Sequence, residues 1–331
     1  MNFLRNVGRV TKAAGVAVIM ALALALGLAL ALALGLTNAT PAQADPPTGT
    51  HPPIVGVCAD RVTPVLDALG QGNFACYGSS GSPVIEPRPA NCQIARPNGS
   101  SAGIDALRRD IDTKAGCLDF AGVTRGPLDT STQDLSWIQF GAEGVTAAVR
   151  GDSPLRGQPL TLTGLRQIYT CQTTQVAGIR VNPLLPQPGS ATRSEWLSTL
   201  GISEAQLGAC VGGPVPENNG TVLTAAGHIV PFSISSYIAQ MNGVQTDTRG
   251  RVVLAPVDGV APITGQGTFN THFPYIHLVY VVVDTARLVN TDINAAFVGA
   301  SSRLCRNPAV TAFYGFGALS NCGTVAATGE R

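Results

Sequence analysis

The chain has 331 residues, of which 45% are hydrophobic and only 12% are charged, and its formal net charge is +1. A charge so nearly balanced excludes bulk electrostatic binding to nucleic acids or to anionic membranes, because both need a basic patch. The apolar share is enough to bury a core, and the length fits one two-lobed unit rather than a single small domain.

The N-terminus has the pattern of an export signal over residues 1–44. Three basic residues precede an uncharged run over 13–36, and Ala42-Gln43-Ala44 supplies a small-x-small cleavage site. We expect a Sec-type signal peptide cut after Ala44 and a secreted or cell-envelope protein of net charge −2, from 18 remaining basic and 20 acidic residues. The run is long enough to span a bilayer, so an uncleaved membrane anchor is the alternative.

Eight cysteines follow residue 57, and an even number in an exported chain indicates disulfides. We expect sequential pairing, although other pairings are open. The expected pairs are Cys58–Cys76, Cys92–Cys117, Cys171–Cys210 and Cys305–Cys322. The sequence has no CxxC pair and no cluster of Cys and His, so it predicts neither a metal site nor a cofactor.

In the first half of the mature chain, strand patterns alternate with helix patterns. A Pro/Thr-rich linker over 45–53 leads into an apolar strand at 54–57 and a helical run that ends near Leu69. A further helix is predicted from Gly99 to about Arg109 and a strand at 118–121. Two extended stretches follow, at 135–140 and 145–149.

The second half continues this alternation, which predicts an α/β fold. Apolar residues recur at helical spacing over 162–169, behind Thr161 or Thr163 as cap. The other expected elements are a strand at 179–185, helices opening at Ser203 and at Pro231, a buried strand at 277–283 and a helix near 294–298.

Two loops of small hydroxyl residues stand directly before predicted helices. The first serine loop, Gly99–Gly103, contains Ser100 and Ser101, and the second serine loop, Gly189–Arg193, contains Ser190 and Thr192. The free N–H groups and the positive dipole of a helix start attract anions, and glycine lets an anion approach the backbone. Two such loops favour an oxyanion held between two lobes. Ordinary helix caps are the alternative.

Seven segments, in the same order along the chain, resemble the Pst-type phosphate-binding proteins of ABC transporters. They are residues 54–60, 96–107, 116–126, 160–172, 184–197, 229–240 and 304–319. The resemblance implies a type 2 periplasmic-binding-protein fold, in which two mixed sheets flanked by helices are joined by two crossover strands. It places 54–139 plus 280–331 in one lobe and 141–277 in the other.

The resemblance also implies a ligand set and partners. Ser100 and Ser101 would bind the oxyanion from the first serine loop, and Ser190, Thr192 and Arg193 from the second. Asp60 and Thr124 would contribute from the ends of two strands. The implied function is phosphate uptake by a monomer that delivers its ligand to an ABC permease, with no enzymatic activity.

Three departures from the family pattern bear on the ligand. The loop after the first strand reads Cys58-Ala59-Asp60-Arg61, Thr124 stands where a carboxylate is common, and Pro186-Gln187 replaces an expected arginine. An ionised carboxylate accepts the proton of hydrogen phosphate and repels sulfate. Unless Asp60 or Asp119 substitutes for it, discrimination between the two anions is lost.

Two other functions compete with transport. One is an exported binding protein of the same fold with another ligand or none. The other is a serine hydrolase, because Gly99–Gly103 formally matches G-x-S-x-G with Ser101 as nucleophile. That motif needs a buried strand running into the turn, and the sequence before Gly99 does not predict one.

Overall fold

The computed structural model describes residues 45–47, 49–89 and 91–330. The expected signal peptide and its cleavage site lie outside the described residues. Among the helices that are described, none combines the length and the apolar character needed to cross a bilayer. The predicted linker contains no helix or strand, but it is held in place: Arg96 forms a salt bridge with Asp45 at 2.6 Å, and Arg88 donates to the carbonyl of Pro52 at 2.9 Å.

Eleven strands form one mixed sheet. They are β1 (Ile54–Cys58), β2 (Phe74–Tyr77), β5 (Phe120–Val123), β6 (Leu135–Arg150), β9 (Asn182–Pro186), β10 (Gly212–Val215), β11 (His228–Ser233), β12 (Val252–Leu254), β13 (Ile276–Asp284), β14 (Gly317–Ala318) and β15 (Val325–Thr328). The main path is β10-β9-β11-β6-β13-β5-β1-β2, and β12, β14 and β15 pair with β6. Two small hairpins are separate, β3 (Val84–Ile85) with β4 (Ile94–Ala95) and β7 (Gln175–Val176) with β8 (Ile179–Arg180).

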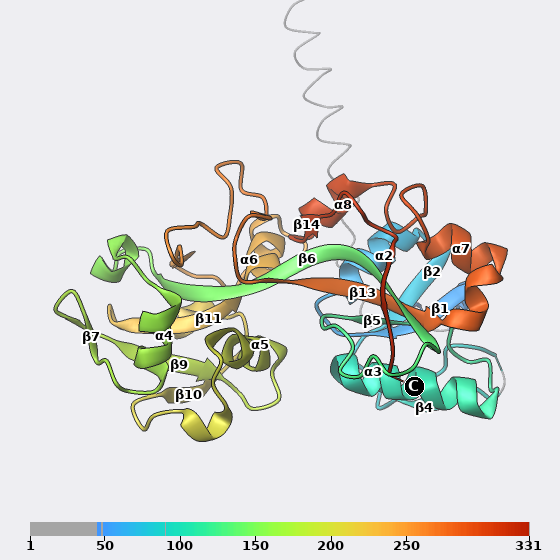
Figure 1. Ribbon diagram of the computed structural model, residues 1–331, viewed down its shortest axis with the longest axis horizontal. Helices are drawn as coiled ribbons and strands as arrows, with labels where there is room; N and C mark the ends of the chain where they lie inside the picture. Colours follow the sequence, from blue (N-terminus) through green and yellow to red (C-terminus); the bar gives the residue numbers. More distant parts are fainter. Residues whose placement is uncertain (1–44, 48, 90, 331) are drawn as a thin grey trace, which may run out of the picture. The chain divides into compact units, whose positions relative to one another are not determined.

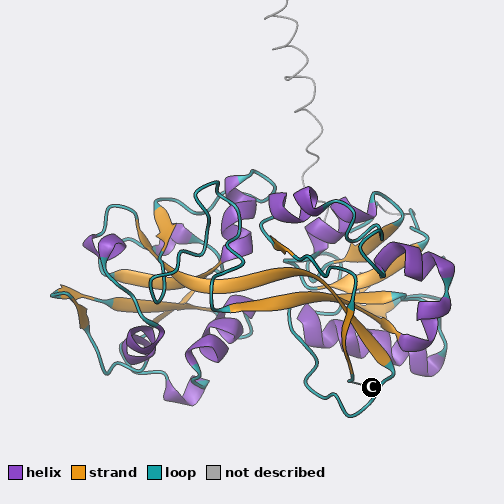
Figure 2. Ribbon diagram, turned by 45° about the horizontal axis from the view of Figure 1, so that its top comes forward, coloured by secondary structure: helices purple, strands orange, loops and turns teal. Residues whose placement is uncertain are grey.

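Seven α-helices flank this sheet in the described residues (Figure 2). They are α2 (Thr63–Gly70), α3 (Gly99–Thr113), α4 (Leu162–Tyr169), α5 (Ala191–Leu200), α6 (Ile234–Met241), α7 (Thr291–Phe297) and α8 (Pro308–Phe313). The predicted cap of α4 is present, since the side chain of Thr161 accepts a hydrogen bond from the N–H of Gly164.

The long strands β6 and β13 join two lobes and cross between them (Figure 1). They pair antiparallel along their length. The buried side chains of residues 142–273 form a large core and a small one around Phe232, and we call this part the second lobe. Those of residues 54–140 and 279–316 form two cores on the other side of the crossing, which together make the first lobe. This two-lobed α/β arrangement is the fold class predicted from the sequence.

Several expected elements differ from the structure. The strand predicted at 179–185 is divided between β8, in a hairpin, and β9, in the main sheet, and the helix predicted to open at Ser203 is a 3₁₀ turn over Glu204–Gln206. The two extended stretches predicted at 135–140 and 145–149 are one strand, β6. Gly141 and Gly144 lie between them, and glycine allows the backbone there to lie close to β13 and to Tyr275. A Cβ at Gly144 would stand 2.7 Å from the carbonyl oxygen of Tyr275. The helix predicted from Pro231 begins only at Ile234, since Pro231 still pairs with Ala147 in β11.

The eight cysteines form four disulfides, Cys58–Cys76, Cys92–Cys117, Cys171–Cys210 and Cys305–Cys322. These are the four sequential pairs expected from the sequence. The first two and the last lie within the first lobe, and Cys171–Cys210 ties the end of α4 to the segment before β10. Each disulfide therefore braces one lobe and leaves the crossing strands free of covalent links between the lobes.

Candidate functional site

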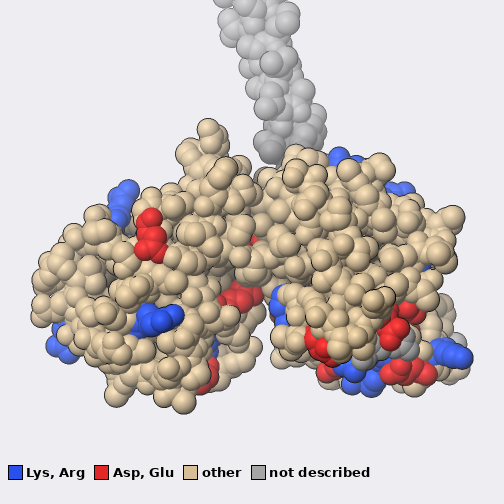
Figure 3. Space-filling model, viewed as in Figure 1, with Lys and Arg blue, Asp and Glu red and all other residues tan. Residues whose placement is uncertain are grey.

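A cavity of about 590 Å³ lies between the two lobes. The first lobe lines it with residues that include Ser79, Ser100 and Thr124, and the second lobe with residues that include Ser190 and Glu217. Figure 3 shows a notch between the lobes with side chains of both charge signs at its edges. The cavity is thus polar and open, and both serine loops reach it.

The first serine loop presents the start of the 15-residue helix α3 to the cavity. The side chain of Asn98, at the N-cap position, does not cap this helix. Gly99 adopts a φ of +82° and donates its N–H to the hydroxyl of Ser79 at 3.0 Å. The hydroxyl of Ser100 accepts from the N–H of Thr124 at 3.1 Å, which ties the helix start to the end of β5. The positive end of the helix dipole therefore faces the cavity without a side-chain cap from Asn98.

The second serine loop differs because the chain supplies its own anion there. Ser190 caps α5 by accepting from the N–H of Arg193 at 3.1 Å. The N–H and the hydroxyl of Thr192 both donate to Oε1 of Glu217, at 3.0 and 2.5 Å. A carboxylate is favourable at a helix N-terminus for the same reason as a bound oxyanion. The donors of Thr192 are consequently engaged by Glu217.

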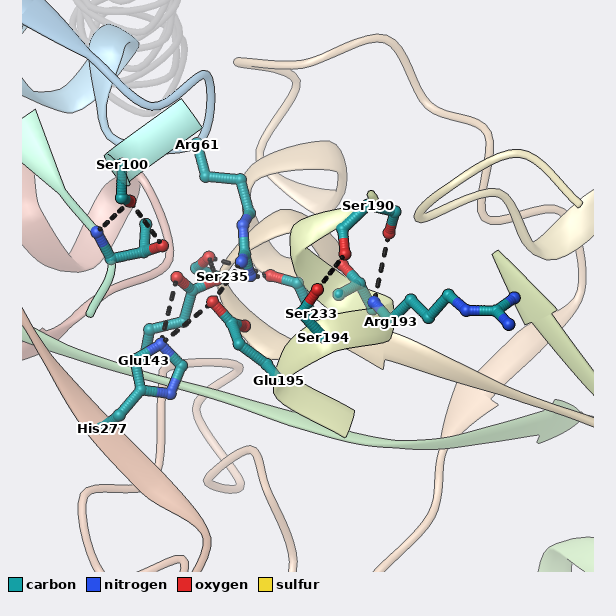
Figure 4. A network of polar contacts seen from close by, with 12 residues as sticks. Arg61, Ser100, Glu143, Ser190, Arg193, Ser194, Glu195, Ser233, Ser235 and His277 are labelled. Atoms are coloured by element: carbon teal, nitrogen blue, oxygen red, sulfur yellow. Dashed lines mark hydrogen bonds and ion pairs between the residues drawn. The ribbon is translucent and has the colours of Figure 1, made fainter. Parts of the chain in front are cut away.

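Arg61 is the cation of the cavity, and it bridges the lobes. It follows β1 in the first lobe, and its Nη1 and Nη2 donate to Oε1 of Glu143 at 2.7 Å and to Oε1 of Glu195 at 2.5 Å (Figure 4). Burial alone would lower the pKa of Arg61, but the two carboxylates outweigh it and hold the pKa above its ordinary value. Arg61 is therefore a permanent positive charge whose guanidinium is committed to protein partners.

The carboxylate of Glu143 is fully buried on β6 and accepts further bonds at Oε1, from Ser233 at 2.7 Å and Ser235 at 2.5 Å. Burial would raise the pKa of Glu143, but Arg61, His277 and the two hydroxyls hold it below its usual range. At Glu195 the effect of burial is the larger one, and the pKa is raised in spite of Arg61. Glu143 is thus the firmly ionised member of this pair.

The structure brings four of the predicted ligand residues to the cavity: Ser100, Thr124, Asp60 and Ser190. The carboxylate of Asp60 already accepts from the N–H of Ser79 at 2.6 Å and from the hydroxyl of Ser80 at 3.3 Å. Asp60 therefore organises the loop beside the first serine loop as well as lining the cavity.

Three predicted ligand residues do not line this cavity. Ser101 is exposed, and its hydroxyl accepts from Nε of Arg125 at 3.1 Å. Thr192 is fully buried beneath Glu217 rather than on a loop surface. The side chain of Arg193 points away from Ser190 (Figure 4), and it pairs with Glu204 at 2.5 Å.

Sequence reasoning missed Arg61, Glu143, Glu195, Glu217 and His277. Each of these residues belongs to no recognisable motif in its own segment. The fold brings them close to one another, and the sequence does not show this. Asp119, considered as a substitute carboxylate, is structural instead. It accepts from the N–H of Val55 at 2.7 Å and pairs with Arg88 and with Arg287.

The surroundings of Ser101 do not match a hydrolase nucleophile. The strand nearest before the turn, β4, has only two residues and pairs with β3 outside the main sheet. A nucleophile elbow needs a buried strand that runs directly into the turn. The hydroxyl of Ser101 also accepts from Arg125, and among the described residues no imidazole forms a hydrogen bond with it.

No family model matches the sequence. No curated protein matches it either. Solved structures match its fold, and two of them are the following. One is a proposed phosphate ABC transporter substrate-binding protein of Clostridium perfringens with bound phosphate, at 15% identity and a TM-score of 0.52. The other is an ABC-type phosphate transport receptor of Vibrio cholerae, at 17% identity and a TM-score of 0.55. Each match covers 80% of this chain and 100% of the other. The chain therefore has the two-lobed fold of these transport receptors.

Proposed function

We propose that the protein is an exported solute-binding protein that binds an oxyanion and delivers it to an ABC permease. Phosphate is the oxyanion that we propose. The observation that carries the proposal is the start of α3, which faces an interlobe cavity without a cap from Asn98. The Clostridium perfringens protein of the same fold was solved with bound phosphate, which supports this choice of ligand.

In this proposal the first lobe supplies the anion-binding groups. The N–H groups of the first turn of α3 and the hydroxyls of Ser100 and Thr124 would donate to the oxyanion. Hydrogen bonds from N–H and O–H donors to an ionised acceptor are charge-assisted and strong. The second lobe would close over the ligand by hinge motion of the crossing strands and bring Ser190 toward it.

Glu217 has a defined part in this proposal. Its side chain lines the same cavity from the second lobe. In this proposal it would take the place of the carboxylate that is common in the family at the position of Thr124. An ionised carboxylate accepts hydrogen bonds but cannot donate them. It would therefore accept the proton of hydrogen phosphate and repel sulfate, which carries no proton at neutral pH.

The test is calorimetry on ligand-stripped protein, titrated with phosphate and with sulfate at neutral pH. We expect saturable heat with phosphate and at least tenfold weaker binding of Ser100→Ala. The matched control is Ser198→Ala, which removes an exposed hydroxyl from α5 away from the cavity. Absence of heat from both anions would contradict the proposal, and so would unchanged phosphate binding by Ser100→Ala.

One observation favours a second candidate, an exported protein that keeps the fold without binding an oxyanion. Glu217 already satisfies both donors of Thr192. If that contact is permanent, the second lobe has no need of a ligand. Failure of both the native protein and Glu217→Gln to bind either anion would select this candidate.

A further inference from the structure

Three side chains from three different elements converge beside Arg61. Glu143 on β6 and His277 on β13 are direct partners in the strand register, and Glu195 projects from α5 of the second lobe. One ligand atom from each of the three lies within 4.8 Å of the others. Figure 4 shows the imidazole of His277 beside both carboxylates. This arrangement is independent of the serine loops.

Each residue of this group has one buried polar atom without a hydrogen bond in the described part of the chain. Oε2 of Glu143, Oε2 of Glu195 and Nε2 of His277 are buried and have no hydrogen-bond partner among the described residues. Nε2 stands 3.8 Å from Oε2 of Glu143 and 3.5 Å from Oε1 of Glu195, and both contacts are ion pairs without a hydrogen bond. Buried polar atoms without partners are rare and costly, and those of the fully buried Glu143 most of all.

We propose that Glu143, Glu195 and His277 bind a divalent transition-metal ion, preferably zinc, through Oε2 of Glu143, Nε2 of His277 and one carboxylate oxygen of Glu195. One imidazole nitrogen and two carboxylate oxygens are a donor set that zinc accepts, with a water as fourth ligand. Calcium and magnesium prefer oxygen ligands, so the imidazole nitrogen of His277 disfavours both ions.

One oxygen of each carboxylate already accepts from Arg61, and this fixes the orientation of both carboxylates. Oε1 of Glu143 accepts from Arg61, Ser233 and Ser235, and Oε1 of Glu195 accepts from Arg61. Such outer contacts fix the direction of metal ligands. Arg61 also offsets one of the two negative charges, so we expect weaker zinc binding than at a site with two uncompensated carboxylates.

The test uses the full chain without a histidine tag, stripped of metal and titrated with zinc chloride by calorimetry. We expect one zinc per chain, no measurable calcium or magnesium binding, and an absorption band of tetrahedral cobalt when Co²⁺ is added instead. His277→Gln should weaken zinc binding at least tenfold and remove the cobalt band. His272→Gln, which alters an exposed histidine, should change neither.

Three results would overturn the proposal: no zinc binding by the native chain, equal binding by His277→Gln, or loss of binding in His272→Gln. Unfolding temperatures of the metal-free variants show whether His277→Gln is folded. If it is not, Glu195→Gln takes its place, because Glu195 is less buried than Glu143 and the amide can still accept from Arg61.

Discussion

Glu217 and Thr192 form a contact in which a side-chain carboxylate occupies the first turn of α5. Thr192 donates both its N–H and its hydroxyl to the same oxygen, Oε1 of Glu217. The first serine loop has no such internal anion at its N-cap, since Asn98 leaves α3 uncapped. The two loops look alike in sequence, yet only the first offers its helix start to a ligand.

Glu217→Gln should change anion selectivity. The amide keeps an oxygen that accepts from Thr192 but loses the negative charge that repels sulfate. We expect sulfate affinity to rise at least tenfold, about 1.4 kcal/mol, while the preference for phosphate shrinks. Competition calorimetry with both anions measures this. Glu86→Gln, which removes an exposed charge elsewhere, is the control. A phosphate-to-sulfate ratio unchanged by Glu217→Gln would contradict the role given to this carboxylate.

Arg61→Met should destabilise the protein strongly. It leaves the fully buried Glu143 without its cation. Removing one partner of a buried ion pair lowers the free energy of unfolding by about 3–5 kcal/mol. Adding Glu143→Gln should recover part of the loss, because no uncompensated charge then remains at that position. Urea denaturation gives both free energies of unfolding.

The exposed pair Arg108–Asp105 provides the matched control for Arg61. Both side chains are more than a third exposed, so Arg108→Met should cost less than about 1 kcal/mol. A similar cost for Arg61→Met and Arg108→Met would show that the Arg61 bridge contributes little to stability.

Much of the fold could be predicted because its signals are local. The β-branched run at 277–283 forms the core of β13, and Thr161 caps α4 through a bond within one turn. The bridge at Arg61 could not be predicted in this way. Its partners Glu143 and Glu195 lie 82 and 134 residues after Arg61 in the chain. They meet Arg61 only because the two lobes lie together where β6 passes between them. Glu217 was likewise hidden in a turn with no helix or strand pattern.

Gly144→Ala should distort the strand crossing. An added Cβ would stand 2.7 Å from the carbonyl oxygen of Tyr275, a backbone atom that cannot rotate away. Overpacking of this kind costs about 1–3 kcal/mol. Thermal unfolding measures the loss. Gly265→Ala, where an added Cβ meets nothing within 4 Å, should leave stability nearly unchanged. Equal unfolding temperatures for the two variants would contradict the close approach at Gly144.

Asp67 should make the protein less stable as the pH rises. Burial raises the pKa of Asp67 from 3.8 to about 7, although the N–H of Cys76 donates to its Oδ1 at 2.8 Å. The folded state therefore holds this proton to higher pH than the unfolded chain does. Between the two pKa values the folded state binds more protons, so this contribution to the free energy of unfolding is fully present in acid and is lost as the pH rises through 7.

Asp67→Asn tests this linkage, because asparagine can accept from the same N–H but cannot ionise. We expect the variant to gain about 2 kcal/mol over the native chain at pH 8, after discounting for the partial exposure of the side chain, and almost nothing at pH 4. Urea denaturation at both pH values measures the difference. Asp105→Asn, an exposed substitution on α3, is the control and should show no such dependence. A gain of equal size at pH 4 and pH 8 would mean that packing, not the proton, distinguishes the variant.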